Sequence, residues 1–148
     1  MFPSHDPPGY EKNVNNRKHS HLCILAKSHE GYRNLLKITE IANKNYYYKP
    51  RISLDEIKPY SKDIIAFSGH SASDMFNVIW LNENGVYGAT SIEEAESYIH
   101  PDYEKLLQSK LNEYLNVFGD NFFLEIQLHD HERMPSQRVS AELLSDRS

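Results

Sequence analysis

Three short apolar runs, separated by longer segments with helical periodicity, constrain the fold of this chain more than any other feature of its sequence. The runs cover residues 21–27, 63–67 and 121–127, and each is short enough to form a strand buried on both faces. Between the first two runs, apolar residues recur at helical spacing from residue 29 to residue 44. Strands that alternate with helices predict an α/β fold with parallel strands and right-handed crossover helices.

Capping and turn residues mark the expected ends of the helices. Ser28 is a natural N-cap for the helix after the first run, and Ser53 precedes Glu56 at the spacing of a capping box. Ser91 is expected to cap another helix with an acidic first turn. Residues 82–90 are expected to form a turn followed by a loop. The remaining helices are predicted near residues 72–81, 102–117 and 135–144.

Size and composition exclude several classes of protein. A chain of 148 residues, 39% hydrophobic and 25% charged, fits one compact domain or a large piece of one. The 16 basic and 21 acidic side chains give a net charge of -5, so any nucleic-acid contact must be local or made through metal ions. No apolar stretch approaches the about 20 residues of a membrane helix, and the start of the chain lacks the features of a signal peptide. The single cysteine, Cys23, fits a reducing compartment, and we expect a cytoplasmic protein without a membrane partner.

The histidine in the string FSGHSAS, His70, is the first candidate for a functional residue. In α/β folds the reacting groups gather at the carboxyl ends of parallel strands, and His70 comes three residues after the second apolar run. A polar loop residue after a strand is also common, so the position alone leaves a purely structural role open.

Two His-x-His pairs are further candidates. His19 and His21 would place both rings on one face of a strand, as metal sites often require, but two histidines do not complete a site. His129 and His131, with Asp130 between them, follow the third run in a polar stretch. A solvated loop is the better interpretation of that stretch.

Three other features have both a structural and a functional interpretation. Glu125 lies inside the third run and is expected to face a polar interior or a basic partner, with a direct metal role as the alternative. Cys23 is predicted to be a core thiol rather than a nucleophile. Tyrosines 46–48, with Lys49 and Arg51, would suit base stacking and phosphate contact, but a packed helix terminus is favoured.

Four strings, taken in order, resemble one protein family. "HLCILAKSHEGYRNLLKI", "YYYKPRISLDEI", "DIIAFSGHSASDM" and "VFGDNFFLEIQ" are similar to the polymerase and histidinol phosphatase (PHP) domain of the C-family replicative DNA polymerases, the alpha subunits of bacterial DNA polymerase III. The segment "SGHSASDMFNVIW" looks more like phage-borne versions than cellular ones. The resemblance implies part of a distorted (β/α)7 barrel of the PHP type. Residues 1–20 would be a loop or truncated start, and residues 21–148 an interior segment that ends before the last metal motif.

The resemblance also implies two metal ligands. His21, at the head of "HLCILAK", matches a family ligand, and His70 falls where many members have the cysteine of "SGC". Imidazole and thiolate both bind zinc-like ions, and the family's site holds divalent ions such as zinc, manganese or magnesium. The other family ligands have no match in this chain, and His19, His129 and His131 do not replace them. Two ligands are too few for a catalytic cluster.

The function implied by the resemblance belongs to a parent polymerase. Its PHP domain would support metal-dependent phosphoester hydrolysis or 3'-5' proofreading, with DNA, other replisome subunits and the remainder of the PHP barrel as partners. The segment alone is expected to be inactive. One alternative is a non-catalytic structural or interaction module, whose incomplete barrel exposes strand edges and apolar surface to a partner. The other is a free-standing PHP phosphoesterase, which requires a full set of ligands.

Overall fold

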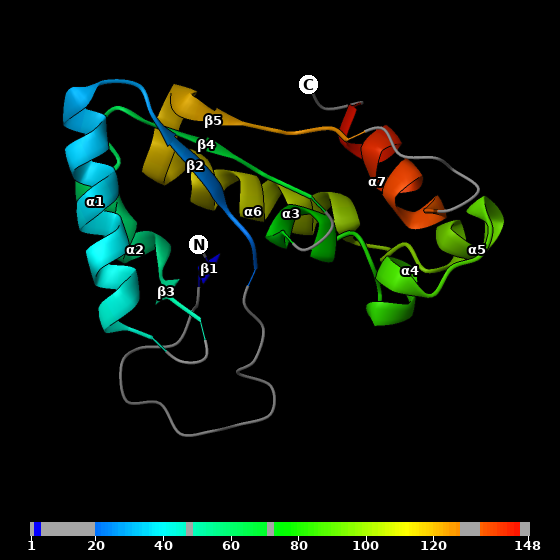
Figure 1. Cartoon of the computed structure of the whole chain (residues 1–148). Helices are drawn as coiled ribbons and strands as arrows, with labels where there is room; N and C mark the ends of the chain where they lie inside the picture. Colours follow the sequence, from blue (N-terminus) through cyan, green and yellow to red (C-terminus); the bar gives the residue numbers. More distant parts are fainter. Residues whose placement is uncertain (1, 4–19, 47–48, 71–72, 128–133, 146–148) are drawn as a thin grey trace. The chain divides into compact units, whose positions relative to one another are not determined.

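The computed structural model describes residues 2–3, 20–46, 49–70, 73–127 and 134–145, which form a mixed α/β structure (Figure 1). The chain divides into two compact units. The first unit consists of Met1–Phe67 and Glu113–Phe123, and the second of Ser68–Asn112 and Leu124–Ser148. The mixed α/β content confirms the predicted fold class. Among the described residues, no helix combines the length and the hydrophobicity that a membrane-spanning segment needs.

The first unit contains a three-stranded sheet in the order β2–β4–β5. Its strands are β2 (Cys23–Ala26), β4 (Ile64–Phe67) and β5 (Phe122–Phe123). Strands β4 and β5 are parallel, as predicted, but β2 is antiparallel to β4, with Cys23 opposite Phe67. The prediction of an all-parallel sheet is therefore wrong for β2. A separate parallel pair joins β1 (Phe2–Pro3) to β3 (Arg51–Ile52).

Two helical segments between β2 and β4 explain the antiparallel pairing. Helix α1 (His29–Lys44) leads away from the end of β2, and α2 (Leu54–Ile57) with the 3-10 turn η2 (Lys58–Tyr60) brings the chain back alongside α1 (Figure 1). The backbone N–H of Lys27 donates to the carbonyl of Asp63 at 2.8 Å, so the chain re-enters the sheet at the end that it left. A single crossover helix would have brought the next strand in from the opposite end and made the pair parallel.

The N-terminus of α1 is hydrogen-bonded to Asp63, the residue before β4. Ser28 Oγ accepts a hydrogen bond from the Gly31 N–H at 3.1 Å and donates one to Asp63 Oδ2 at 2.7 Å. Asp63 has a φ of 59°, in the left-handed region that few residues other than glycine adopt. A Cβ atom at Gly31 would lie 2.2 Å from the Asp63 carbonyl oxygen. This position therefore requires glycine, because the helix and the strand backbone are in direct contact.

The predicted caps of two further helices are also present. Ser53 and Glu56 form the capping box of α2, and Asn45 Nδ2 donates to Glu56 Oε1 at 2.8 Å. Burial alone would raise the pKa of Glu56, but the hydrogen bonds from Ser53 and Asn45 outweigh burial and lower that pKa. Ser91 caps α5 (Ile92–Ser97) and accepts from the N–H at the third helical position at 3.1 Å.

One face of the sheet is covered by helices. Side chains opposite each other on paired strands point to the same face, so the register places Ile64, Ala66 and Phe122 together. All three are buried. Tyr114, in the part of α6 (Tyr103–Phe118) that belongs to the first unit, stacks on Phe122 with ring centroids 5.0 Å apart. This face and α1 form the core of the first unit.

The other face, called the open face here, consists of Cys23, Leu25, Ile65, Phe67 and Phe123. Leu25 is 56% exposed and Phe123 is 48% exposed. Cys23 is exposed as well. The predictions that the first run is buried on both faces and that Cys23 is a core thiol are therefore wrong, because helices cover only one side of this sheet. The described residues leave an apolar surface of five side chains on the other side.

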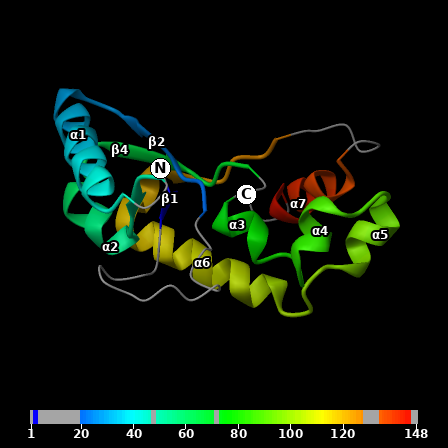
Figure 2. The same ribbon diagram turned by 60° about the horizontal axis from the view of Figure 1, so that its bottom comes forward.

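The second unit is mostly helical (Figure 2). It contains α3 (Asp74–Asn77), α4 (Glu83–Tyr87), α5, α7 (Pro135–Ser145) and the first part of α6, up to residue 112. Helices α4 and α5 pack against α7. The buried side chains of this unit include Met75, Phe76, Ile79, Trp80, Ala95, Leu107, Val139 and Leu144.

Two helix predictions in the second unit are wrong. The helix predicted at residues 72–81 is only the single turn of α3, and the loop predicted at residues 82–90 contains α4. The Ile79 carbonyl accepts from the His100 N–H at 2.7 Å, and the Leu81 N–H donates to the Tyr98 carbonyl at 2.8 Å. These two backbone hydrogen bonds, between residues far apart in the sequence, use the N–H and C=O groups that a continued helix would need.

Candidate metal centre

His21 lies in the first unit, two residues before β2, and is half-buried. Because β2 is antiparallel to β4, the start of β2 is paired with the end of β4, Cys23 opposite Phe67. The chain around His21 therefore leads into the sheet at the carboxyl end of β4. A parallel β2 would have placed His21 at the opposite end, away from the edge where α/β folds gather their reacting groups.

His70 lies in the second unit, three residues after the end of β4, and is also half-buried. Gly69, with a φ of 75°, precedes it in a turn that most residues could not adopt. The His70 carbonyl accepts a hydrogen bond from the Ser73 N–H at 2.8 Å. His70 is thus held between the end of a strand and the N-cap of α3, as expected for a residue that follows a strand.

Glu125 lies in the second unit, just beyond the end of β5. Its backbone N–H donates to Ser68 Oγ at 2.8 Å, and Ser68 is 2% exposed. One carboxylate oxygen, Oε1, accepts a hydrogen bond from the side-chain amide of Gln127. The polar surroundings expected for Glu125 are therefore present, and they are supplied by an amide.

Several candidates from the sequence fall outside the described residues: His19, His129, Asp130, His131, Tyr47 and Tyr48. Tyr46, at the end of α1, is described and is 62% exposed. Within the described ranges, no three histidine, cysteine or carboxylate side chains come together as a metal site would require. His21 precedes the start of β2 in the first unit, and His70 follows the end of β4 in the second.

Two serines that the sequence did not single out lie next to these histidines. Ser20 and Ser73 are each 2% exposed, and their hydroxyl groups have no hydrogen-bond partner among the described residues. Ser20 directly precedes His21, and Ser73 follows His70 by three residues. Serine close to histidine is too common a pattern to be noticed in a sequence. Burial without a partner is visible only in the structure.

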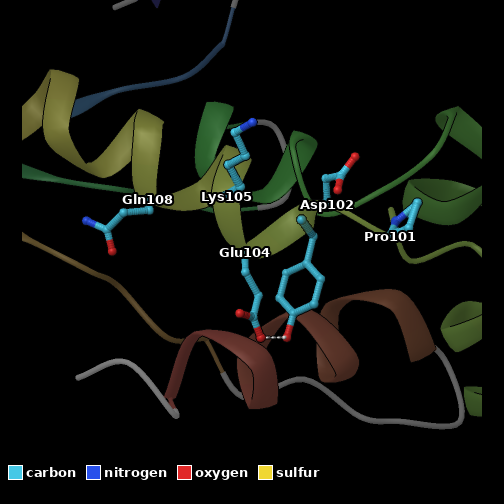
Figure 3. Close-up of a pocket in the computed structure, with 6 residues that line it drawn as sticks. Pro101, Asp102, Glu104, Lys105 and Gln108 are labelled. Atoms are coloured by element: carbon cyan, nitrogen blue, oxygen red, sulfur yellow. Dashed lines mark hydrogen bonds between the residues drawn. The ribbon is translucent and has the colours of Figure 1, made fainter.

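A pocket of about 480 Å³ in the second unit is a different kind of feature (Figure 3). It is lined by residues at and before the start of α6: Pro101, Asp102, Tyr103, Glu104, Lys105 and Gln108. Tyr103 Oη donates to Glu104 Oε1 at 3.4 Å, while the Asp102 side chain points away from Glu104 (Figure 3). The two carboxylates do not converge on a common point, so this lining has no arrangement for acid–base or metal chemistry.

Comparison with known proteins identifies the relatives of the chain. The family model of the PHP domain matches residues 8–129. DNA polymerase III subunit alpha of Thermus aquaticus is 32% identical over 127 residues, which are 85% of this chain and 8% of that protein. The protein of the same name from Deinococcus radiodurans is 32% identical over 125 residues, 84% of this chain and 8% of the relative. That of Helicobacter pylori (strain 26695) is 36% identical over 112 residues, 74% of this chain and again 8% of the relative. The chain thus spans about 8% of the length of these relatives.

Proposed function

The chain belongs to the PHP domain family, and on this basis we propose that it is a segment of a DNA polymerase III alpha subunit, a DNA-directed DNA polymerase. The sequence identity to three such subunits supports the proposal. In this role the segment acts in DNA replication in the cytoplasm, with DNA and the other replisome subunits as partners of the parent polymerase.

His21 and His70 are proposed as metal ligands of the PHP domain. The observation that carries this assignment is the register of β2 and β4, which pairs the strand ends that the two histidines adjoin in sequence, Cys23 with Phe67. The donor chemistry fits zinc or manganese, because neutral imidazole is a good ligand for both. The remaining ligands would come from polypeptide outside residues 1–148.

The activity proposed for the complete domain is hydrolysis of a phosphodiester at the 3' end of DNA. A divalent ion would supply charge neutralisation and a water molecule of lowered pKa. The part proposed for this chain is to supply the two imidazoles, which adjoin the start of β2 and the end of β4 in the sequence. Because an imidazole must lose its proton to bind a metal, acid is expected to weaken metal binding.

A partial (β/α)7 barrel is proposed for the fold, with the remainder of the PHP barrel packed on the open face. The exposed fractions of Leu25 and Phe123, 56% and 48%, support this proposal, since soluble proteins rarely leave a contiguous apolar surface uncovered. The antiparallel β2 makes the barrel irregular at this point. The segment alone would therefore lack the other metal ligands of the domain, and it would also lack its packing partners. We expect it to be inactive by itself.

The test is made in a polymerase that carries this segment. Replacing both His21 and His70 with alanine should abolish the release of a mismatched 3' nucleotide while nucleotide incorporation continues. His29→Ala is the matched control, because His29 is an exposed histidine on α1. Unchanged release in the double variant would rule out the catalytic assignment and leave a structural role for the domain.

A non-catalytic interaction module is the second candidate, and the open face favours it. Such a module would associate with a partner chain through Leu25, Phe67 and Phe123 whether or not metal is present. Size-exclusion chromatography of residues 1–148 tests whether the open face needs a partner chain. A clean monomer with one cooperative thermal transition would argue against a surface that has to be covered.

A further inference from the structure

The solvent side of α1 presents one row of residues that the core of the first unit leaves uncovered. Residues three or four apart lie on the same face of a helix, and this spacing defines an outer row of Tyr32, Leu36, Thr39 and Asn43. All four residues are exposed. The two apolar members, Tyr32 and Leu36, are 52% and 53% exposed. The outer row therefore carries apolar surface that packing within the first unit does not use.

The two polar members of the outer row have hydrogen-bond partners inside the helix. Thr39 Oγ1 donates to the Leu35 carbonyl at 2.8 Å, and Asn43 Nδ2 donates to the Thr39 carbonyl at 2.8 Å. Covering a polar group is costly when its donors lose water and gain no other partner. Both hydrogen bonds would persist under a partner, so covering the outer row costs less than covering most exposed polar residues.

A second row, called the basic row here, runs alongside the outer row. It consists of Arg33, Lys37, Glu40 and Lys44, which are all exposed. Glu40 accepts from Lys37 at 3.0 Å and from Lys44 at 2.8 Å. The hydrogen bonds from Lys44 and Lys37 lower the pKa of Glu40 to about 2, so this carboxylate stays ionised. With three positive charges and one negative charge, the basic row is positive near neutral pH.

The charge of the whole chain hides this positive surface. Residues 1–67 and 113–123, which make up the first unit, include 11 basic and 9 acidic side chains, a net charge of +2. The second unit has 5 basic and 12 acidic side chains, a net charge of -7. The excess of negative charge thus belongs to the second unit. An acidic partner that approaches α1 meets no excess of negative charge in the first unit.

We propose that the outer row of α1 binds a helix of a partner polypeptide, and that acidic side chains of this helix pair with the basic row. Apolar residues three and four apart, with charged pairs alongside, are a common mode of helix recognition. A second copy of α1 does not fit, because two basic rows would repel each other. A phosphate backbone offers negative charge but no apolar surface for Leu36. An amphipathic helix with an acidic flank satisfies both rows.

This inference does not depend on His21 or His70. It rests on the proposed function only for the source of the helix, which would be the parent polymerase outside residues 1–148 or another replisome subunit. The experiment places a photo-crosslinking amino acid at position 36 of a polymerase that carries this segment, assembled with its replisome subunits on primed DNA. Leu115 is the control position, because it is an exposed leucine on α6 of the first unit and no charged residue lies one turn from it.

Position 36 should crosslink to one peptide outside residues 1–148, with apolar residues three or four apart and Asp or Glu beside them. Position 115 should not crosslink to that peptide. Arg33→Glu should lower the yield about tenfold, because like charges across an interface are strongly unfavourable. Arg33→Lys keeps the charge and should leave the yield unchanged. Neither change alters the ion pairs of Glu40, and far-UV circular dichroism should show the same helix content in both variants.

The outcomes separate this inference from the proposed function. A crosslink from position 36 to DNA or to a second copy of the segment, or no crosslink at all, would refute the docking of a helix on α1. A crosslinked peptide without acidic residues, or an unchanged yield with Arg33→Glu, would refute the charge pairing. Nucleotide incorporation by the same preparation tests the proposed function: crosslinking without incorporation contradicts the polymerase assignment, and incorporation without crosslinking contradicts only the role of α1.

Discussion

Replacing Gly31 with alanine tests the contact that holds β2 and β4 in register. The new Cβ atom would lie 2.2 Å from the Asp63 carbonyl oxygen and 3.0 Å from its carbonyl carbon. Both are backbone atoms, so no side chain can rotate away. Either α1 or the start of β4 must move. This movement would stretch or break the backbone hydrogen bond from the Lys27 N–H to the Asp63 carbonyl, which is 2.8 Å long.

The size of the effect follows from three terms. Overpacking a tight contact costs about 1–3 kcal/mol, and loss of the backbone hydrogen bond between Lys27 and Asp63 costs about 0.5–1.5 kcal/mol. Alanine offsets part of this, since it is favoured over glycine within a helix by about 1 kcal/mol. The net destabilisation of Gly31→Ala is therefore expected to be about 0.5–3.5 kcal/mol.

Urea unfolding followed by far-UV circular dichroism gives the free energy of unfolding, and Trp80 fluorescence reports on the second unit. Gly119→Ala is the comparison variant: Gly119 has a φ of 54°, but a Cβ atom there would meet nothing within 4 Å. Strain without a clash costs about 1–2 kcal/mol. If Gly31→Ala is as stable as Gly119→Ala or more stable, the close contact between α1 and Asp63 does not stabilise the pairing of β2 with β4.

Three further predictions concern the capping box, the open face and the thiol. The pKa of Glu56 is lowered in the folded chain, so its ionised form stabilises the protein above the ordinary value of 4.5, and this contribution is lost as the pH falls through the folded pKa; urea unfolding at several pH values should show the stability difference between wild type and Glu56→Gln shrinking in acid. Leu25→Ser should reduce binding of a hydrophobic dye and self-association, whereas Leu36→Ser, at an exposed leucine on α1, should change neither; equal effects would contradict a special role for the open face. Native Cys23 should react with a thiol reagent about as fast as the unfolded chain does, and strong protection would show that the thiol is covered.

The local structure was largely predictable because short-range chemistry determines it. Ser28, Ser53 and Ser91 cap helices in the structure as their spacing indicates. The direction of β2 was not predictable, because it depends on whether one helix or two helical segments of opposite direction connect the strands. Periodicity identifies a helix but does not tell where the chain returns to the sheet. The exposure of Cys23 was missed for a related reason, since a continuous apolar run does not show how many faces of its sheet are covered.

The same limit affected the candidate site. His70 was recognisable from its position after a strand, and that argument needed only the local order of the chain. His21 precedes its strand, so an all-parallel sheet would place it at the end opposite to the one that His70 follows. In the structure, β2 runs in the reverse direction, and its start is paired with the end of β4.

The net charge of the segment bears on how it would contact DNA under the proposed function. With a net charge of -5, the segment has no general attraction for a phosphate backbone, and binding by basic side chains would be strongly weakened by salt. Under the proposed function, a divalent ion would supply positive charge at one point without requiring a basic surface. Contact of this segment with a 3' end should therefore depend on the presence of the ion far more than on salt concentration.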